Sequence, residues 1–296
     1  MTRSLRTLAA VTLVLLLFFI KPCRRLITFS MHDELFSYIP LVPFISVYLL
    51  WSNKQRFVFA VRPCWLGALV ASLAGAALLA IYWMASWTGH LLEGPDYLTL
   101  MTLSLLCFFW SACLAVLGAQ VLGQVAFPAA FLIFAVPMPT SWLAYVTTFF
   151  QYTSAVAAQG FFHVCGTPVS RDGLILQLPD FALRVAPECS GIHSTMVLFM
   201  TSWIAGYMFL NRAWQRCLLA LIVIPLAIIR NGFRICVVGE LCVHVSHEMI
   251  DSPIHRKGGP LFFALSLIPF LLLLLFLRRF NIPQIQSNGR QPQPGI

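Results

Sequence analysis

The chain has 296 residues, of which 59% are hydrophobic and only 10% are charged, and its formal net charge is +9 at pH 7. Soluble domains carry about 25% charged residues, and the mean hydropathy here is +0.85, so the composition excludes an ordinary soluble protein and indicates a polytopic membrane protein. The basic residues lie in short loops between apolar runs, which is the pattern that orients membrane helices. We therefore expect contact with membrane lipids and no nucleic-acid partner.

The first apolar run, 5–20, follows Arg3 and Arg6 and resembles a signal peptide. No small-x-small cleavage site follows it, and the next residues are basic, so we interpret it as a retained first helix. Most of the nine cysteines lie inside apolar runs, where free cysteine behaves as a small hydrophobic residue. They form no disulfide framework.

Apolar runs long enough to cross a bilayer, or nearly so, occur eight times along the chain. They are 5–20, 36–51, 63–86, 98–118, 121–137, 191–210, 215–238 and 260–277. The predicted fold class is an all-α polytopic membrane protein with about eight transmembrane helices. We see no internal repeat, so a transporter built from two similar halves has little support.

The segment 141–165 is helical in character but carries many polar side chains, and Pro137 and Pro139 precede it. These features favour an amphipathic or re-entrant helix. In the following segment, 166–185, Asp172 and Gly173 form a turn signal between strand-like residues, which predicts a short extracytoplasmic β-hairpin. We expect one integral membrane domain over 1–280, with its catalytic part at about 166–277, and a flexible cytoplasmic tail over 281–296.

Basic residues predict the orientation of the helices. Arg212 and Arg216 separate two runs, and Arg278 and Arg279 follow the last run, so both groups should be cytoplasmic. Eight spans with both termini inside put both groups in the cytoplasm, provided that 141–165 does not cross the membrane. Lys21, Arg24 and Arg25 then fall on the outer side, and a nine-span alternative that rescues them misplaces five other basic residues.

A cysteine stands at the predicted outer end of the helix at 191–210, within A-P-E-C-S-G-I-H (186–193). A helix N-terminus stabilises negative charge and can lower a thiol pKa below its free value of about 8.5. Its neighbours Glu188 and Ser190 are polar, which argues against tight apolar packing. Cys189 is therefore a candidate nucleophile, and a buried structural cysteine is the alternative.

Two arginines, Arg230 and Arg234, share one helix face in R-N-G-F-R (230–234). A charge at membrane depth costs at least ~2.5 kcal/mol and usually faces a partner or a water-filled cavity. Arg234 lies about 27 Å along the helix from Arg216 at 1.5 Å per residue, which puts it level with Cys189. Arg230 is one turn deeper and is expected to pair with Asn231 or a backbone carbonyl, and a snorkelling arginine is the alternative for Arg234.

A histidine, His255, precedes the last helix on the same predicted side. A thiol, a guanidinium and an imidazole at one water–lipid border suit acyl transfer at a peptide bond. The thiolate attacks the carbonyl, the imidazole moves the protons, and the guanidinium stabilises the oxyanion or the thiolate. The predicted catalytic residues are thus Cys189, Arg234 and His255, and no cofactor is needed.

Other readings of these polar residues remain open. His193, four residues after Cys189, is a rival base. A zinc site is another reading, but its spacing matches no common ligand pattern, and we expect no metal; its residues would be Cys236, Cys242, His244 and His247. The run S-G-I-H-S (190–194) lacks G-x-S-x-G, which argues against a serine hydrolase.

Three motifs in this order resemble the exosortase/archaeosortase family: A-P-E-C-S-G-I-H, R-N-G-F-R and H-R-K-G-G (255–259) before a final helix. The early H-D-E-L-F-S-Y-I-P (32–40) and the A-V-P-M-P (135–139) are also similar, so the resemblance covers about 30–277. Ser37-Tyr38 stands where many relatives have Ser-His, and we expect no copy of the family's optional C-terminal domain after Arg279. His255 favours the bacterial branch, because archaeal relatives tend to have arginine there.

The resemblance implies an integral membrane cysteine transpeptidase, similar in chemistry to sortase but unrelated in fold, in the bacterial inner membrane with a periplasmic site. Its implied partners are exported proteins with a C-terminal sorting signal, namely a short motif such as Pro-Glu-Pro, a transmembrane helix and a basic cluster. An acceptor nucleophile of unknown identity would resolve the thioester, and hydrolysis is the alternative. A transporter or assembly factor, in which Arg230 and Arg234 line a pathway, is the rival from another class.

Overall fold

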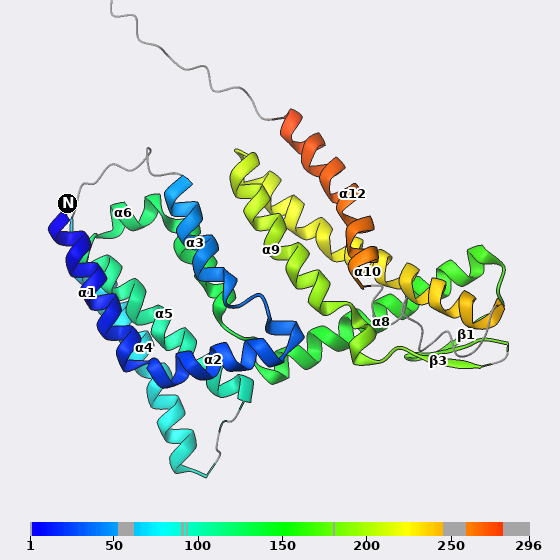
Figure 1. Cartoon of the computed structure of the whole chain (residues 1–296), viewed down its shortest axis with the longest axis horizontal. Coiled ribbons are helices and arrows are strands. Elements are labelled where there is room, and N and C mark those ends of the chain that lie inside the picture. Colours follow the sequence, from blue (N-terminus) through cyan, green and yellow to red (C-terminus); the bar gives the residue numbers. More distant parts are fainter. Residues whose placement is uncertain are drawn as a thin grey trace, which may run out of the picture. The chain divides into compact units, whose positions relative to one another are not determined.

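The structure is a computed structural model that describes residues 2–52, 62–89, 92, 94–179, 181–244 and 259–280. The chain divides into two compact units. The first comprises Met1–Tyr152 with Ala186–His193, and the second comprises Thr153–Val185 with Ser194–Ile296. Helices dominate both units, and one small sheet belongs to the second (Figure 1).

Five helices of the described residues are long and apolar enough to cross a membrane, and the count rises to seven if each of two bent helix pairs is one span. The predicted all-α polytopic class is therefore confirmed, while the predicted number of eight spans is approximate. The five candidate spans are Glu34–Ser52, Trp65–Trp87, Gly94–Val116, Ala213–His244 and Gly259–Arg279.

The first unit is a bundle of helices whose longest members, α4 and α5, pack against each other (Figure 1). Its elements are α1 (Thr2–Phe18), α2 (Ile20–His32), η1 (Glu34–Phe36), α3 (Leu41–Ser52), α4 (Trp65–Trp87), α5 (Gly94–Val116), α6 (Ala119–Gln124), α7 (Ala126–Phe131), η3 (Leu132–Ala135), the first half of α8 (Thr140–Cys165) and η4 (Pro187–Ser190). Small residues let α4 and α5 approach closely, and the Ser104 hydroxyl donates a 2.9 Å hydrogen bond to the Gly75 carbonyl. Hydrogen bonds of this kind, made by small polar residues, commonly stabilise the packing of membrane helices.

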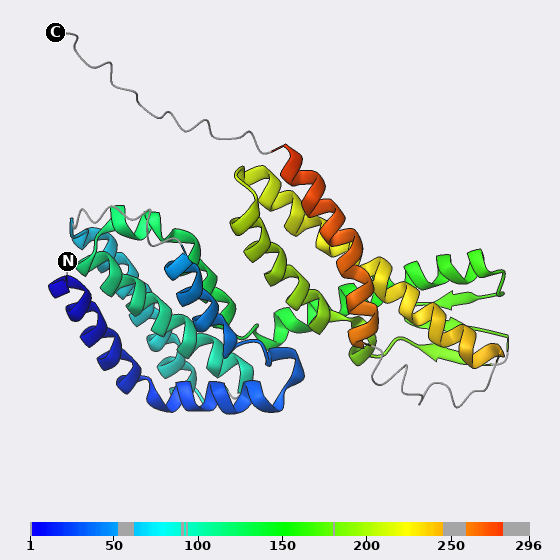
Figure 2. The same cartoon turned by 45° about the horizontal axis from the view of Figure 1, so that its top comes forward.

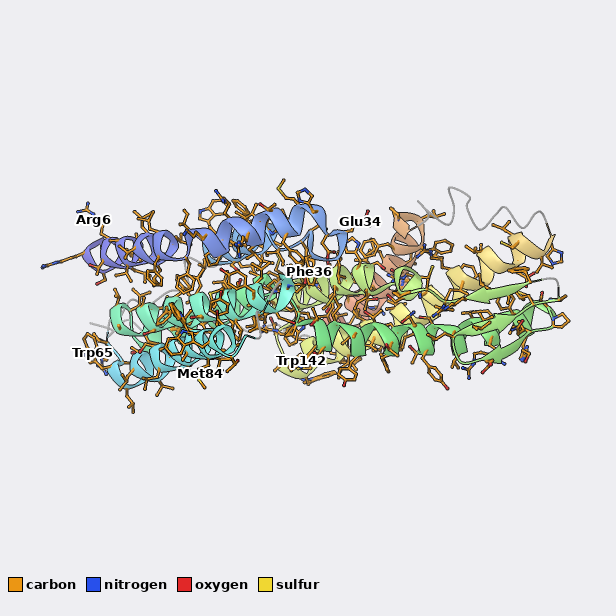
Figure 3. All side chains as sticks on the ribbon, turned by 90° about the horizontal axis from the view of Figure 1, so that it is seen from below. Arg6, Glu34, Phe36, Trp65, Met84 and Trp142 are labelled. Carbon is orange, nitrogen blue, oxygen red and sulfur yellow. The ribbon has the colours of Figure 1, made fainter. Side chains whose placement is uncertain are left out.

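Apolar side chains cover the outside of the bundle. Trp65, Met84 and Trp142 are 72%, 68% and 67% exposed, and they project from the ribbon in Figure 3, whereas Phe36 is fully buried. A soluble protein rarely exposes so much contiguous apolar surface. These side chains suit contact with lipid tails, in agreement with the composition.

The first apolar run ends in a bend. Helix α1 and helix α2 form a pair bent by 74°, and α2 carries Lys21, Arg24 and Arg25 on its exposed side. A helix with one apolar and one basic face suits the membrane interface. If α2 lies along the membrane surface after this bend, its three basic residues do not follow a complete span, so the orientation rule does not require them to be cytoplasmic.

The apolar run 121–137 is not one straight helix. It is divided among α6, α7 and η3, and the segment Ala126–Ala135 meets α8 at an angle of 91°. Asp96 at the start of α5 accepts 2.7 Å hydrogen bonds from both the backbone nitrogen and the hydroxyl of Thr140. These bonds hold the first residue of α8 at the bend, as expected of a broken span or a re-entrant segment.

A three-stranded antiparallel sheet in the second unit contains the predicted hairpin. Strands β1 (Ser170–Asp172) and β2 (Ile175–Gln177) form that hairpin, and β3 (Ala182–Arg184) adds to it in the order β1-β2-β3. Gly173 in the turn has φ +59°, a conformation that glycine adopts without the cost a side chain brings. Figure 2 shows the sheet beside the C-terminal part of α10.

The rest of the second unit is built on α9 (Ile192–Phe209), α10 (Ala213–His244) and α12 (Gly259–Arg279). Leu198, Leu219, Val223 and Phe270 are among the buried residues that join these three helices. The fully buried Gln215 side chain donates to the Leu277 carbonyl at 2.9 Å. The two basic groups next to these residues, at 212–216 and 278–279, therefore lie at the same end of the unit, as the orientation rule requires.

Candidate functional site

Cys189 lies in a short turn of 3-10 helix, η4 (Pro187–Ser190), that directly precedes α9. Gly191 follows with φ +71°, a left-handed conformation that ends the turn and starts α9. The Cys189 backbone nitrogen donates to the Ala186 carbonyl at 2.9 Å, and the side chain is half-buried. Ser190 is 1% exposed, so the thiol directly precedes a buried hydroxyl and lies three residues before the start of the apolar helix α9.

Arg230 lies on α10 in the second unit and is 7% exposed. Its Nη2 atom donates a 2.6 Å hydrogen bond to the hydroxyl of Ser194, which lies in the first turn of α9. A buried guanidinium needs such a partner, because burying an isolated charge is costly. The sequence predicted a partner at Asn231 or a backbone carbonyl, and that pairing stays a prediction; the Ser194 hydroxyl is a partner that the sequence did not suggest.

The residues after Arg230 set the spacing between α10 and the end of α8. A Cβ atom added at Gly232 would lie 2.6 Å from the Ala157 Cβ, so only glycine permits this approach. Asn231 is 2% exposed, and Arg234 is half-buried. Because Gly232 faces α8, close packing explains the glycine of R-N-G-F-R without any catalytic role.

The other predicted site residues are placed as follows. His193 is exposed, and the backbone of Glu188 belongs to η4. His255 lies outside the described residues. Cys189 belongs to the first unit and Arg234 to the second, so the grouping of the thiol, the guanidinium and the imidazole remains a prediction.

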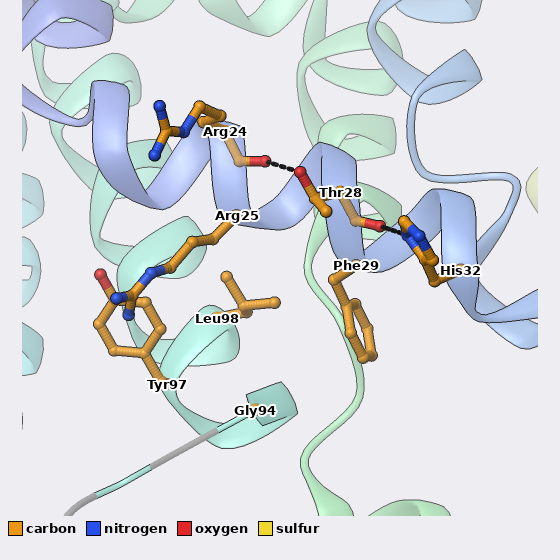
Figure 4. A pocket seen from close by; sticks show the side chains of 8 residues that line it. All are labelled: Arg24, Arg25, Thr28, Phe29, His32, Gly94, Tyr97 and Leu98. Carbon is orange, nitrogen blue, oxygen red and sulfur yellow. Dashed lines mark hydrogen bonds between the residues drawn. The ribbon is translucent and has the colours of Figure 1, made fainter.

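A hollow of about 580 Å³ lies in the first unit between α2 and the start of α5 (Figure 4). The Arg25 guanidinium stands over the Tyr97 ring, 5.4 Å from its centroid, and His32 Nδ1 donates to the Thr28 carbonyl at 2.8 Å. The hollow is lined by two cations, Arg24 and Arg25, of which Arg25 is engaged with Tyr97, and the imidazole of His32 is engaged with its own helix. Cys189 and Arg234, the two predicted catalytic residues within the described ranges, do not line it.

A comparison with protein families identifies the chain. A family model described as Transmembrane exosortase (Exosortase_EpsH) matches residues 27–272, which is well over half of the 296 residues. The chain belongs to the transmembrane exosortase family. No curated protein and no solved structure matches it.

The matched region of this exosortase contains the cysteine, arginine and histidine motifs and, apart from the last seven residues of α12, the five candidate spans of the described residues; most of the bent pair α1–α2 precedes it. Family membership and the spans together establish an integral membrane protein. They also agree with the resemblance drawn from the three motifs.

The sequence interpretation of this exosortase missed two features of the second unit. Ser194 was not expected to bind Arg230. An arginine inside a membrane helix needs a polar partner, and a search of the neighbouring apolar runs for hydroxyl residues could have suggested Ser194. Glu240, the one acidic residue of α10, was also overlooked. Its carboxylate accepts from the Thr167 hydroxyl at 2.5 Å, and Cys165 and Cys236 lie beside it. The zinc group considered from spacing includes His247, which lies outside the described residues.

Proposed function

We propose that this exosortase is a membrane cysteine transpeptidase or peptidase that removes the C-terminal sorting signal of exported proteins. Cys189 is the nucleophile, Arg234 stabilises the developing charge, and His255 transfers the protons. The observation that supports this most directly is the Arg230–Ser194 hydrogen bond. It ties the arginine-bearing helix to the first turn of α9, five residues after Cys189.

The reaction has two steps. The Cys189 sulfur attacks the carbonyl carbon of the scissile peptide, a C–S bond forms, the C–N bond breaks, and the leaving amine takes a proton from the imidazolium of His255. An amine or water then attacks the thioester, gives its proton to the imidazole, and the Cys189 thiolate leaves. The Arg234 guanidinium stabilises the oxyanion of each tetrahedral intermediate.

The half-buried position of Cys189 before a membrane helix suits a substrate that is itself anchored in the bilayer. A substrate helix would lie among the spans, with its short motif at the membrane border. We propose that the site is on the periplasmic side of a bacterial inner membrane. The basic groups at 212–216 and 278–279 follow α9 and α12 and favour the cytoplasm, whereas Cys189 precedes α9.

The test uses a tagged exported protein of the same organism that ends in a short motif, a membrane helix and a basic cluster. Replacing Cys189 by Ala should make the uncut precursor accumulate, and Cys217→Ala, an exposed cysteine of α10, is the matched control. Hydroxylamine added to wild-type membranes should yield a hydroxamate at the new C-terminus, because it captures a thioester. Normal processing by the Cys189→Ala protein would refute the proposal and favour a transporter or assembly factor.

A further inference from the structure

The strongest unassigned cluster joins the end of α8 to α10 within the second unit. The Sγ atoms of Cys165 and Cys236 and a carboxylate oxygen of Glu240 all lie within 4.8 Å of one another. This is the one group of three potential metal ligands found among the described residues, which leave out 245–258. All three residues belong to one compact unit.

Local structure directs the three side chains to one point. Cys236 and Glu240 are four residues apart on α10 and therefore share a helix face. Cys165 is the last residue of α8, and Gly166 ends the helix with φ +82°. The Thr167 backbone nitrogen donates to the Phe162 carbonyl at 3.0 Å, which turns the chain back toward α10.

The carboxylate of Glu240 is oriented by two further groups. The Thr167 hydroxyl donates to one carboxylate oxygen at 2.5 Å, and His244 Nε2 lies 3.1 Å from the other. Outer partners of this kind fix the direction of metal ligands. Packing alone does not explain an oriented carboxylate beside two thiols in an otherwise apolar helix.

We propose that Cys165, Cys236 and Glu240 bind a divalent metal ion of zinc type. Two thiolates select a borderline-soft ion over Mg²⁺ or Ca²⁺, and in a tetrahedral zinc site such ligand atoms lie about 3.4–3.8 Å apart. A small inward movement of the side chains reaches that separation. Cys165 is exposed, so water from the solvent supplies the fourth ligand.

Binding is balanced by proton release, because the ion replaces the thiol protons of Cys165 and Cys236, which pass to the buffer. The ion would link the end of α8 to α10 close to where Phe162 packs against Gly239. Its role is to brace this part of the unit. None of its three ligands is a proposed catalytic residue, so the zinc proposal and the proposed function can fail independently.

The experiment uses full-length exosortase in detergent, reduced, loaded with Zn²⁺ alone and freed of excess ion. We expect one zinc per chain, and at least a ten-fold loss of bound zinc in Cys165→Ser, Cys236→Ser and Glu240→Gln. Cys217→Ser and Cys189→Ser should retain it. Cobalt in place of zinc should give the thiolate charge-transfer band of a tetrahedral site.

A second measurement needs no substitution at the site. Zn²⁺ should slow alkylation of Cys165 in the wild-type protein at least ten-fold and leave exposed Cys217 unchanged. The proposal is overturned if Cys165 alkylates at the same rate with and without zinc. It is equally overturned if non-reducing peptide mass spectrometry of freshly extracted protein shows a Cys165–Cys236 disulfide.

Discussion

The Nη2 atom of Arg230 lies 2.6 Å from the hydroxyl of Ser194, so a buried guanidinium on α10 is held by the first turn of α9. The two residues are 36 positions apart in the sequence. Both belong to the family's motif region, Arg230 in R-N-G-F-R and Ser194 directly after A-P-E-C-S-G-I-H. The bond gives a structural reason for the first arginine of that motif, whereas the second is the one proposed for catalysis.

Replacing Ser194 by Ala removes the acceptor of this charged hydrogen bond. A bond to a charged group contributes about 1.5–3 kcal/mol, so we expect a clear fall in the melting temperature in detergent. Ser202→Ala is the matched control, because Ser202 lies on the same helix and its hydroxyl donates to the Phe199 carbonyl of its own helix. Equal melting temperatures for the two variants would contradict the importance of the Arg230–Ser194 bond.

Replacing Gly232 by Ala should push α8 and α10 apart. The new Cβ would lie 2.6 Å from the Ala157 Cβ and 3.0 Å from the Ala158 backbone nitrogen, and overpacking of this kind costs about 1–3 kcal/mol. The comparison is Gly160→Ala on α8, where an added Cβ meets nothing within 4 Å and alanine favours the helix. Thermal unfolding should show Gly232→Ala destabilised and Gly160→Ala unchanged or stabilised; the opposite order would rule out the close approach.

Replacing Asp96 by Ala should release the start of α8. Its carboxylate accepts both exposed Thr140 bonds, and losing a side-chain bond to the backbone at a helix start costs about 0.5–2 kcal/mol. Asp96→Asn should be much milder, because the amide oxygen still accepts from the backbone nitrogen. Limited proteolysis between 136 and 140, followed by mass spectrometry, should show faster cleavage in the alanine variant, and equal cleavage in all three proteins would count against this capping role.

Replacing Arg234 by Ala should impair processing of the tagged substrate. Loss of one oxyanion donor reduces rates by about 10²–10³, while Arg234→Lys keeps the charge but not the planar fork and should lie between. Arg184→Ala, an exposed arginine on β3, is the control. Quantitative blotting of precursor and product checks the order, and full activity of Arg234→Ala would remove the guanidinium from the mechanism.

The membrane class, the basic groups at one end of the second unit and the hairpin at Asp172-Gly173 could all be predicted from the sequence. These features follow from composition or from a few adjacent residues, so no distant contact is needed to recognise them. The candidate residues Cys189, Arg234 and His255 were likewise available from three short motifs. Whether they meet in space is a question of tertiary structure that their spacing does not answer.

The bends and the polar partners depended on the tertiary structure. An apolar run has the same composition whether it crosses straight or breaks, so 121–137 resembled a span although the chain divides it among three short helices. Likewise, Arg230 finds Ser194 and Glu240 finds Thr167 across 36 and 73 positions. In a lipid environment a buried polar group must form a hydrogen bond within the protein. The packing of the helices against one another decides which residue is its partner.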